Sequence, residues 1–183
     1  MDIYKPGEDS YFLTDVLKKN IIDNLDKNDI KVLDVGSGSG ILTNAFINTG
    51  VNPKNITLLA INPKAINHLK INFPESKVIK SNLFSNIKVK FDLIIFNPPY
   101  LPEDKFDKEK DTTGGKTGDE TILKFLKNIK NYLAPEGKAI LLLSSLTPMK
   151  RINQEFKNYR TILLARKKIF FEELFVYELS PSR

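Results

Sequence analysis

The tetrapeptide Asn97-Pro98-Pro99-Tyr100 follows an apolar run at residues 91–96 and could hold a planar amino group. Asn97 offers a side-chain carbonyl, and the proline pair restricts the backbone so that the Pro98 carbonyl points nearby. Tyr100 adds a flat face for packing. Amide and exocyclic amino nitrogens are poor nucleophiles because their lone pair is delocalised, so a catalyst must bind both hydrogens while it orients the nitrogen. The alternative interpretation is a strand followed by an ordinary proline turn.

A glycine-rich turn lies upstream of this tetrapeptide. A short apolar run at residues 31–35 leads into Gly36-Ser37-Gly38-Ser39-Gly40, and residues 41–49 have a helical pattern. Glycine lets a backbone approach a ligand closely. The Gly-x-Gly-x-Gly spacing differs from the Gly-x-Gly-x-x-Gly that places a pyrophosphate on a helix N-terminus, and it suits a nucleoside that carries an amino acid. The turn alone is a weak signal, but with Asn-Pro-Pro-Tyr after a later strand it is a strong one.

Together these motifs resemble the class I S-adenosylmethionine-dependent methyltransferases, and within them the HemK family of amide-directed enzymes. Residues 4–10, Tyr-Lys-Pro-Gly-Glu-Asp-Ser, are similar to that family's N-terminal signature. The resemblance covers nearly the whole chain and is nearest to the short eukaryotic and archaeal members, which lack an N-terminal helical domain. Because the signature starts at residue 4, we expect no such domain here.

The resemblance implies S-adenosylmethionine as the cofactor and assigns roles to matching positions. The amide-binding residues would be those of the Asn-Pro-Pro-Tyr motif, with Asn97, Pro98 and Tyr100 catalytic and Pro99 completing the substrate contact. The Glu8-Asp9 pair and Ser10 would close over the cofactor, although an ordinary helix N-cap is an alternative interpretation of this segment. The implied cofactor-binding residues are Ser10, Asp34, Gly36, Gly38, Ala60, Asn82, Leu83 and Asn97.

Two positions depart from the family pattern. Ala60 stands where the family has an acid that accepts hydrogen bonds from the ribose hydroxyls, and Asn82 stands where it often has aspartate against the adenine amino group. Loss of a charge-assisted hydrogen bond is worth roughly 1.5–3 kcal/mol, or about one to two decades of affinity. Asn62 is a candidate substitute for the acid, and the Asn82 amide oxygen can still accept.

The reaction that the resemblance implies is methylation of a glutamine side-chain amide, in the Gly-Gly-Gln motif of a class I translation release factor. Two alternatives stay open. Asn-Pro-Pro-Tyr can equally accept the amino group of adenine, so an adenine-N6 methyltransferase acting on DNA or RNA is one. Such enzymes extract the base and usually carry an additional recognition region, which this chain lacks. A scaffold subunit with a decayed pocket, suggested by Ala60, is the other.

The chain alternates helical and strand patterns. Apolar spacing predicts helices over residues 7–25, 41–49, 63–72, 119–133 and 148–159. It predicts strands over residues 31–35, 56–61, 77–80, 91–96, 138–144, 161–165 and 174–179, with residues 134–137 breaking a helix and residues 166–168 forming a solvated turn. This order predicts an α/β fold with a Rossmann-like, doubly wound, mostly parallel sheet and an antiparallel strand pair at one edge.

Length and composition indicate a single domain over residues 1–183, which the resemblance implies is a methyltransferase domain. Cysteine is absent and His68 is the only histidine, so we expect no metal site, and the protein is predicted to be cytoplasmic. The net charge of +6 comes mostly from lysine, which indicates direct nucleic-acid binding only weakly. Residues 102–118 form a long polar segment that corresponds to the family's substrate loop. They are not expected to form a phosphate-binding P-loop, because no strand precedes their glycines.

The strand at residues 77–80 should lie at the open edge of the sheet. Short family members work as heterodimers with a small zinc-binding activator that adds strands to this edge, so the resemblance implies such a partner here. Edge pairing supplies main-chain hydrogen bonds and covers an edge that otherwise favours aggregation.

Overall fold

The computed structural model describes residues 3–100 and 115–182. The helices are α1 (Glu8–Asn20), α2 (Ile41–Asn48), α3 (Pro63–Asn72), α4 (Glu120–Asn128) and α5 (Met149–Phe156), with 3-10 turns η1 (Ile22–Asn24), η2 (Pro53–Asn55) and η3 (Ile129–Asn131). The strands are β1 (Val32–Val35), β2 (Ile56–Ala60), β3 (Lys77–Lys80), β4 (Phe91–Phe96), β5 (Leu133–Ser144), β6 (Tyr159–Ile169) and β7 (Glu172–Pro181).

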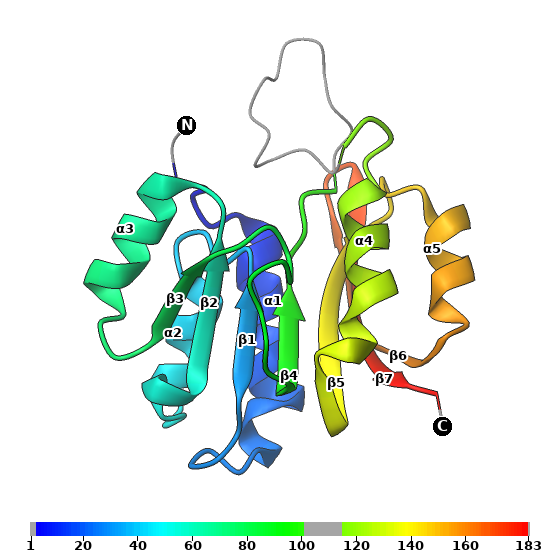
Figure 1. The fold of residues 1–183 in the computed structure, drawn as a ribbon. Helices are drawn as coiled ribbons and strands as arrows, with labels where there is room; N and C mark the ends of the chain where they lie inside the picture. The colour runs from blue at the N-terminus through cyan, green and yellow to red at the C-terminus, as the bar shows by residue number, and fades with distance from the viewer. Residues whose placement is uncertain (1–2, 101–114, 183) are drawn as a thin grey trace.

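Within the described residues, these strands form one sheet in the order β3-β2-β1-β4-β5-β7-β6. The first five strands in that order run parallel, whereas β7 runs antiparallel to both β5 and β6. The chain moves outward from β1 to β3 and then returns to β4, so the strand order reverses between β1 and β4 (Figure 1). Ligands of open α/β sheets bind beyond the carboxyl ends of the strands at such a point. The predicted doubly wound fold is confirmed.

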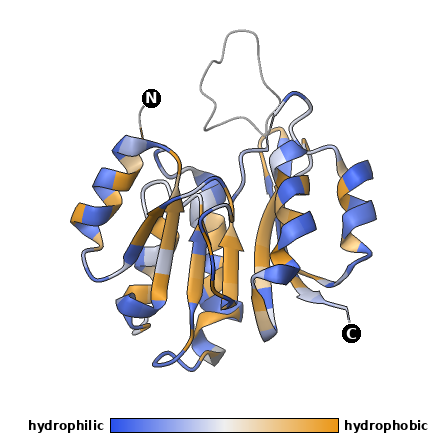
Figure 2. Ribbon diagram, viewed as in Figure 1, coloured by the Kyte–Doolittle hydropathy of each residue, from blue (hydrophilic) through white to orange (hydrophobic). Residues whose placement is uncertain are grey.

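Helices cover both faces of the sheet, and the alternation along each strand decides which side chains face which layer. In β4, Leu93 and Ile95 belong to the core layer that contains side chains of α1, α2 and α3, whereas Ile94 and Phe96 belong to the layer that contains side chains of α4 and α5. Figure 1 shows α4 and α5 in front of the sheet, with α1 and α2 behind it. The central strands are hydrophobic along most of their length, as expected for strands buried on both faces (Figure 2).

The fifth strand starts earlier than the sequence pattern predicts. The helix predicted over residues 119–133 ends at Asn128, and residues 134–137, predicted to be a break, lie inside β5. They form an irregularity in the pairing with β4, because Phe91 pairs with Leu133 and Leu93 with Lys138. A bulge tolerates the proline at position 135, which cannot donate a ladder hydrogen bond.

The hairpin of β6 and β7 is longer than predicted, and the prediction of a turn at residues 166–168 is wrong. Arg166 and Lys167 lie in β6 and pair with Phe175 and Leu174, and the turn falls at residues 170–171. The charged run is compatible with a strand because β6 is an edge strand, where lysine and arginine deter pairing with other chains. The predicted antiparallel edge pair itself is confirmed.

Gly40 precedes α2 and brings the glycine turn close to α3. Its φ of +81° is in the left-handed region, and an added Cβ would lie 2.2 Å from the Phe73 ring. Gly50, at the other end of α2, has a φ of +95°, but an added Cβ there would meet only Lys27 at 3.9 Å. The two positions therefore share backbone strain and differ in the space available.

We predict that Gly50→Ala lowers the free energy of unfolding by about 1–2 kcal/mol, the cost of a left-handed alanine. Gly40→Ala should lower the free energy of unfolding by about 1–3 kcal/mol more than Gly50→Ala does, because its methyl group overpacks the contact with Phe73. Urea unfolding of both variants measures the difference. Equal losses would show that the chain moves Phe73 away at little cost.

Candidate active site

The N-terminal segment and the Asn-Pro-Pro-Tyr motif meet at the carboxyl end of β4. The Asn97 Nδ2 atom donates to Asp9 Oδ2 at 3.0 Å and lies 3.4 Å from Ser10 Oγ. The buried Asp9 carboxylate also accepts from the Tyr4 hydroxyl at 3.1 Å and from the Ser10 backbone N–H at 2.6 Å. The structure therefore brings together Ser10 and Asn97, which are 87 residues apart in the sequence.

The Asp9 carboxylate determines which way the Asn97 amide points. An ionised carboxylate only accepts hydrogen bonds, so the amide nitrogen must face Asp9 and the carbonyl oxygen must face away from it. The Asn97 Oδ1 atom is buried and has no hydrogen-bond partner within the described part of the chain. Buried acceptors without a donor are uncommon and cost free energy. Asn97 thus presents a fixed acceptor that a ligand N–H can satisfy.

Tyr100 is connected to the start of β7 through Glu172. Its hydroxyl hydrogen-bonds to the Glu172 carboxylate, which also accepts from the Ser144 hydroxyl. Burial, followed by the negative charges of Asp9 and Glu172, raises the pKa of Tyr100 above its usual value. Burial and Asp9 likewise raise the pKa of Tyr4 to about 12, so both phenols stay protonated and act as hydrogen-bond donors. Sequence reasoning missed Glu172, since no motif surrounds it.

The glycine turn follows β1, next to β4 in the sheet. Gly36 and Gly38 have φ values of +67° and +52°, and the Ser37 N–H donates to the Leu59 carbonyl at 2.8 Å. An added Cβ on Gly38 would lie 3.9 Å from Tyr4 Cβ, so the N-terminal segment passes beside this turn.

Asp34 ends up buried beneath the turn. Its Oδ2 accepts from the Thr43 hydroxyl at 2.8 Å, whereas its Oδ1 has no partner within the described residues. Burial raises the pKa of Asp34 to about 7, against the smaller opposing effect of the Thr43 and Ser37 hydrogen bonds. The carboxyl group would therefore gain from a cationic partner.

The residues at the ends of β2 and β3 differ from one another in what they offer a ligand. Ala60 ends β2 with its side chain in the apolar core, and no carboxylate replaces it at that position. Asn62, the candidate substitute, accepts from the Lys64 backbone N–H at 2.9 Å and caps α3. Asn82 is exposed, and Leu83 has a φ of +50°, a strained value for a leucine.

Other predicted positions can be placed as follows. Pro98 is buried and Pro99 half-buried, directly after Asn97. His68 is half-buried, as expected for a boundary residue, and its Nε2 lies 3.2 Å from the Ser39 carbonyl of the glycine turn. In the substrate-loop segment, residues 101–114 lie outside the described residues.

The end of that segment is held by α5. Arg151 donates to the Asp119 carboxylate and to the Thr117 hydroxyl. The Thr117 backbone N–H donates to the Glu120 carboxylate at 3.0 Å. A carboxylate in this position disfavours phosphate.

Comparison with known proteins identifies the family. The sequence profile of the methyltransferase small domain matches residues 10–170. The chain belongs to this methyltransferase family. It is 36% identical to a Methanocaldococcus jannaschii protein with the provisional name protein N5-glutamine methyltransferase, over 96% of this chain and 90% of that one. It is 30% identical to methyltransferase HEMK2 of Mus musculus, over 87% of this chain and 78% of the relative.

A solved structure has the same fold over the full length. A chain of the E. cuniculi Mtq2–Trm112 complex, described as responsible for methylation of the eRF1 translation termination factor, is 25% identical with a TM-score of 0.76 and complete coverage of both chains. These matches confirm the predicted resemblance to HemK-family enzymes and the class I methyltransferase fold. The chain is a methyltransferase, and S-adenosylmethionine is its methyl donor.

The residues present fit this cofactor at its methionine end. The unpartnered Asp34 oxygen suits a cationic amino group, and the left-handed glycines leave the backbone of the turn without side chains. Position 60, which the resemblance assigns to the ribose, is an alanine and offers no acid. Among residues 3–100 and 115–182, no helix has both the length and the apolar content needed to cross a membrane.

We predict that cofactor affinity decreases as pH falls below about 7, because protonated Asp34 cannot pair with a cation. The Asp34 carboxyl keeps its proton up to about pH 7 in the folded chain but only up to about pH 3.8 in the unfolded chain. Between these pH values, the contribution of Asp34 to the free energy of unfolding therefore falls as pH rises. Asp34→Asn should therefore stabilise the ligand-free protein at pH 8, by roughly 4 kcal/mol at most, and weaken cofactor binding.

Calorimetry of S-adenosylmethionine binding and thermal unfolding, each at pH 5.5 and 8, measure both effects. Asp92→Asn is the control, since Asp92 is another strand carboxylate with a hydrogen-bond donor, the Lys31 backbone N–H at 2.8 Å, but is only half-buried. Unchanged cofactor affinity in Asp34→Asn would assign Asp34 a structural role only.

Proposed function

We propose that this chain methylates the side-chain amide nitrogen of a glutamine, in the Gly-Gly-Gln motif of a class I translation release factor. The observation that carries the proposal is the Asn97 carbonyl oxygen, held by Asp9 in one orientation and unpartnered among the described residues. The names of the M. jannaschii relative and of the Mtq2–Trm112 complex support it. Residues 1–183 are proposed to act as a single domain, in the cytoplasm where translation factors work.

Asn97 and the Pro98 carbonyl would bind the two hydrogens of the substrate amide group. Because both acceptors lie on a rigid backbone after β4, the nitrogen is oriented before it reacts, and such positioning accounts for most of the rate enhancement. S-adenosylmethionine would supply the methyl group from its sulfonium and leave as the neutral thioether, and the methylated nitrogen would lose one proton to solvent. Asp9 already accepts hydrogen bonds from Tyr4, Ser10 and Asn97, so it acts as a positioning residue.

Tyr100 completes the substrate site. Its hydroxyl is directed to Glu172, so its ring is held in place beside the amide-binding residues, where it can pack against the flat substrate group. The adenine amino group would satisfy the same acceptors. A methylation assay that compares a Gly-Gly-Gln factor with DNA and RNA oligomers distinguishes the two substrates. Methylation of the oligomers and not of the factor would overturn the proposal.

We predict that Asn97→Ala lowers kcat by about 10²- to 10³-fold, the size of effect seen when one preorganised hydrogen-bonding group is lost. Cofactor affinity should stay nearly unchanged, because Asn97 contacts the acceptor amide in the reacting geometry. Asp9→Asn should also lower kcat, because an amide at position 9 no longer forces the Asn97 oxygen toward the substrate. The decrease should be smaller than in Asn97→Ala, because the Asn97 oxygen is still present. Steady-state kinetics and calorimetry with S-adenosylmethionine measure these effects.

Asp15→Asn is the control for Asp9→Asn, because Asp15 lies on the same helix at an exposed position. Wild-type kcat in Asn97→Ala on the glutamine substrate would remove the central argument. Wild-type kcat in Asp9→Asn would remove the positioning role of Asp9 and leave that of Asn97.

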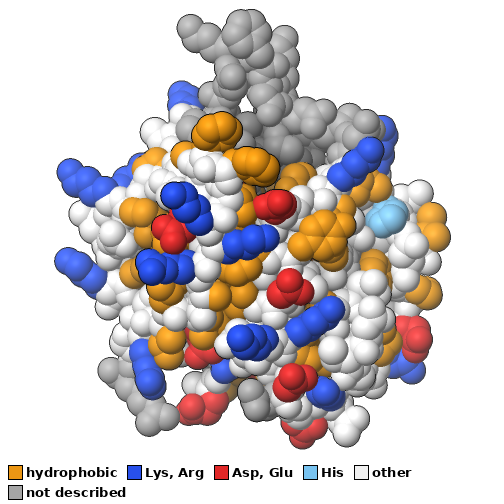
Figure 3. Space-filling view, turned by 180° about the vertical axis from the view of Figure 1, so that it is seen from behind, with side chains coloured by type: hydrophobic (Ala, Val, Ile, Leu, Met, Phe, Trp, Pro, Cys, Tyr) orange, Lys and Arg blue, Asp and Glu red, His pale blue; other side chains and the backbone are white. Residues whose placement is uncertain are grey.

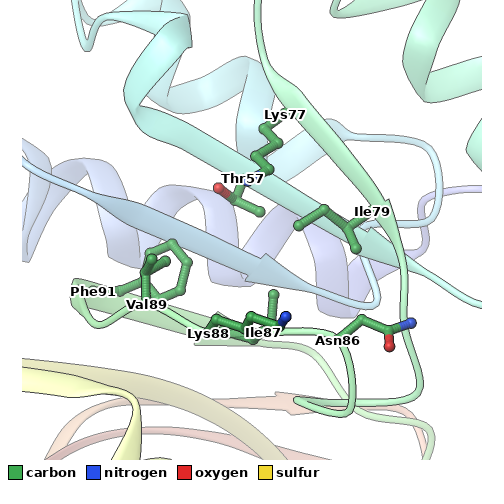
Figure 4. A pocket seen from close by; sticks show the side chains of 8 residues that line it. All are labelled: Thr57, Lys77, Ile79, Asn86, Ile87, Lys88, Val89 and Phe91. Atoms are coloured by element: carbon green, nitrogen blue, oxygen red, sulfur yellow. The ribbon is translucent and has the colours of Figure 1, made fainter.

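A small zinc-binding partner is proposed to pair with the β3 edge. β3 bonds to β2 on one side and ends the sheet among the described residues on the other. A cavity of about 120 Å³ lies beside this edge, between the sheet and residues 86–89 (Figure 4). Its lining includes Ile79 and Val89, of which Val89 is 55% exposed. An exposed edge with apolar residues beside it favours strand addition by a partner.

We predict that co-expression with such a subunit raises the yield of soluble protein and the affinity for S-adenosylmethionine. Val89→Asp should abolish both gains, because it places a charge beside the paired edge. Ile71→Asp is the control, at a 69% exposed position on α3. The proposal fails if the isolated chain is monodisperse, binds the cofactor as tightly as the co-expressed chain does, and forms no complex with the subunit.

A further inference from the structure

Two exposed phenylalanines form the turn between β6 and β7. Phe170 is 90% exposed and Phe171 is 96% exposed, more than any other large hydrophobic side chain in the described residues. Because Ile169 pairs with Glu172, the two are the central residues of a two-residue hairpin turn. The turn lies at the end of the sheet where β1 and β4 also end (Figure 1), and hydrophobic side chains stand at that upper end in the rear view (Figure 3).

This turn costs stability twice. Phe170 has a φ of +28°, at the first central position of a hairpin turn, where glycine or asparagine is favoured and an aromatic residue is strained. Both rings also remain in water, so the fold lacks the stabilisation that burying them would contribute. Gly-Ser at these positions would avoid both costs. Strain and exposure that coincide at one site indicate a function rather than a packing role.

The base of the turn is fixed to the active site. Glu172, the residue after Phe171, accepts hydrogen bonds from Tyr100 and Ser144. The Glu173 N–H donates to Ser145 Oγ at 2.9 Å, and the Ser145 N–H donates to the Glu173 carbonyl at 2.8 Å. The two rings are therefore presented on a rigid base in a constant relation to the Asn-Pro-Pro-Tyr motif.

We propose that the Phe170–Phe171 turn docks the folded protein substrate, by inserting its rings into an apolar pocket beside the reacting glutamine. This inference rests on the proposed function. It adds a second contact surface, through which the enzyme would bind a folded protein in preference to a short peptide. Rigid, exposed aromatic side chains are typical interface anchors, because they bury a large area and lose little conformational freedom. The turn and the amide-binding residues then contact two separate parts of one substrate. A short peptide that carries only Gly-Gly-Gln has no pocket for the rings.

The test compares two substrates with one double variant. Phe170→Gly with Phe171→Ser keeps a favourable hairpin turn and removes both rings. With the folded release factor as substrate, the KM should rise about tenfold or more while kcat stays constant, because hot-spot anchors contribute at least this much. With a short Gly-Gly-Gln peptide, both constants should stay at wild-type values. The melting temperature should not fall, whereas a packing role would lower it.

Ile71→Ser is the control, at an exposed apolar position on α3 that the proposal does not use. An unchanged KM for the folded factor would overturn the docking role. Equal losses on factor and peptide would overturn it as well, since the turn would then serve the amide-binding site itself. Failure of the wild-type chain to methylate either glutamine substrate would instead refute the proposed function.

Discussion

The hydrogen bond from Asn97 to Asp9 is the interaction on which the site depends. It joins the first turn of α1 to the end of β4, and it decides which atom of the Asn97 amide faces a substrate. A carboxylate can be only the acceptor in this bond, so the orientation does not require a ligand to select it. Burial of Asp9 strengthens the contact because little water competes for it.

The same region contains features that reduce stability and make sense only for binding. The Asn97 Oδ1 and Asp34 Oδ1 atoms are buried without partners among the described residues, and the Phe170 backbone is strained. Natural sequences break local rules of this kind mainly at functional sites. All three features lie at the end of the sheet where β1 and β4 finish.

Predictions from the sequence were reliable where a pattern depended on local chemistry and failed where pairing partners decided the outcome. The helix at residues 63–72 has the predicted bounds because a cap and a proline define its start. The strand at residues 77–80 has them because it is a short apolar run. Residues 134–137 and 166–168 were wrongly predicted as a break and a turn. Neighbouring strands stabilise extended backbone there, against the local preferences of Pro135 and of three consecutive cations.

The sequence by itself determined the α/β class, the glycine turn and the Asn-Pro-Pro-Tyr acceptor, because each follows from residue type and short spacing. Only the tertiary structure decided that Asp9 orients Asn97 and that Glu172 holds Tyr100. Each contact joins residues more than 70 positions apart. The spacing along the chain carries no signal for such contacts, since the order of the strands in the sheet creates them.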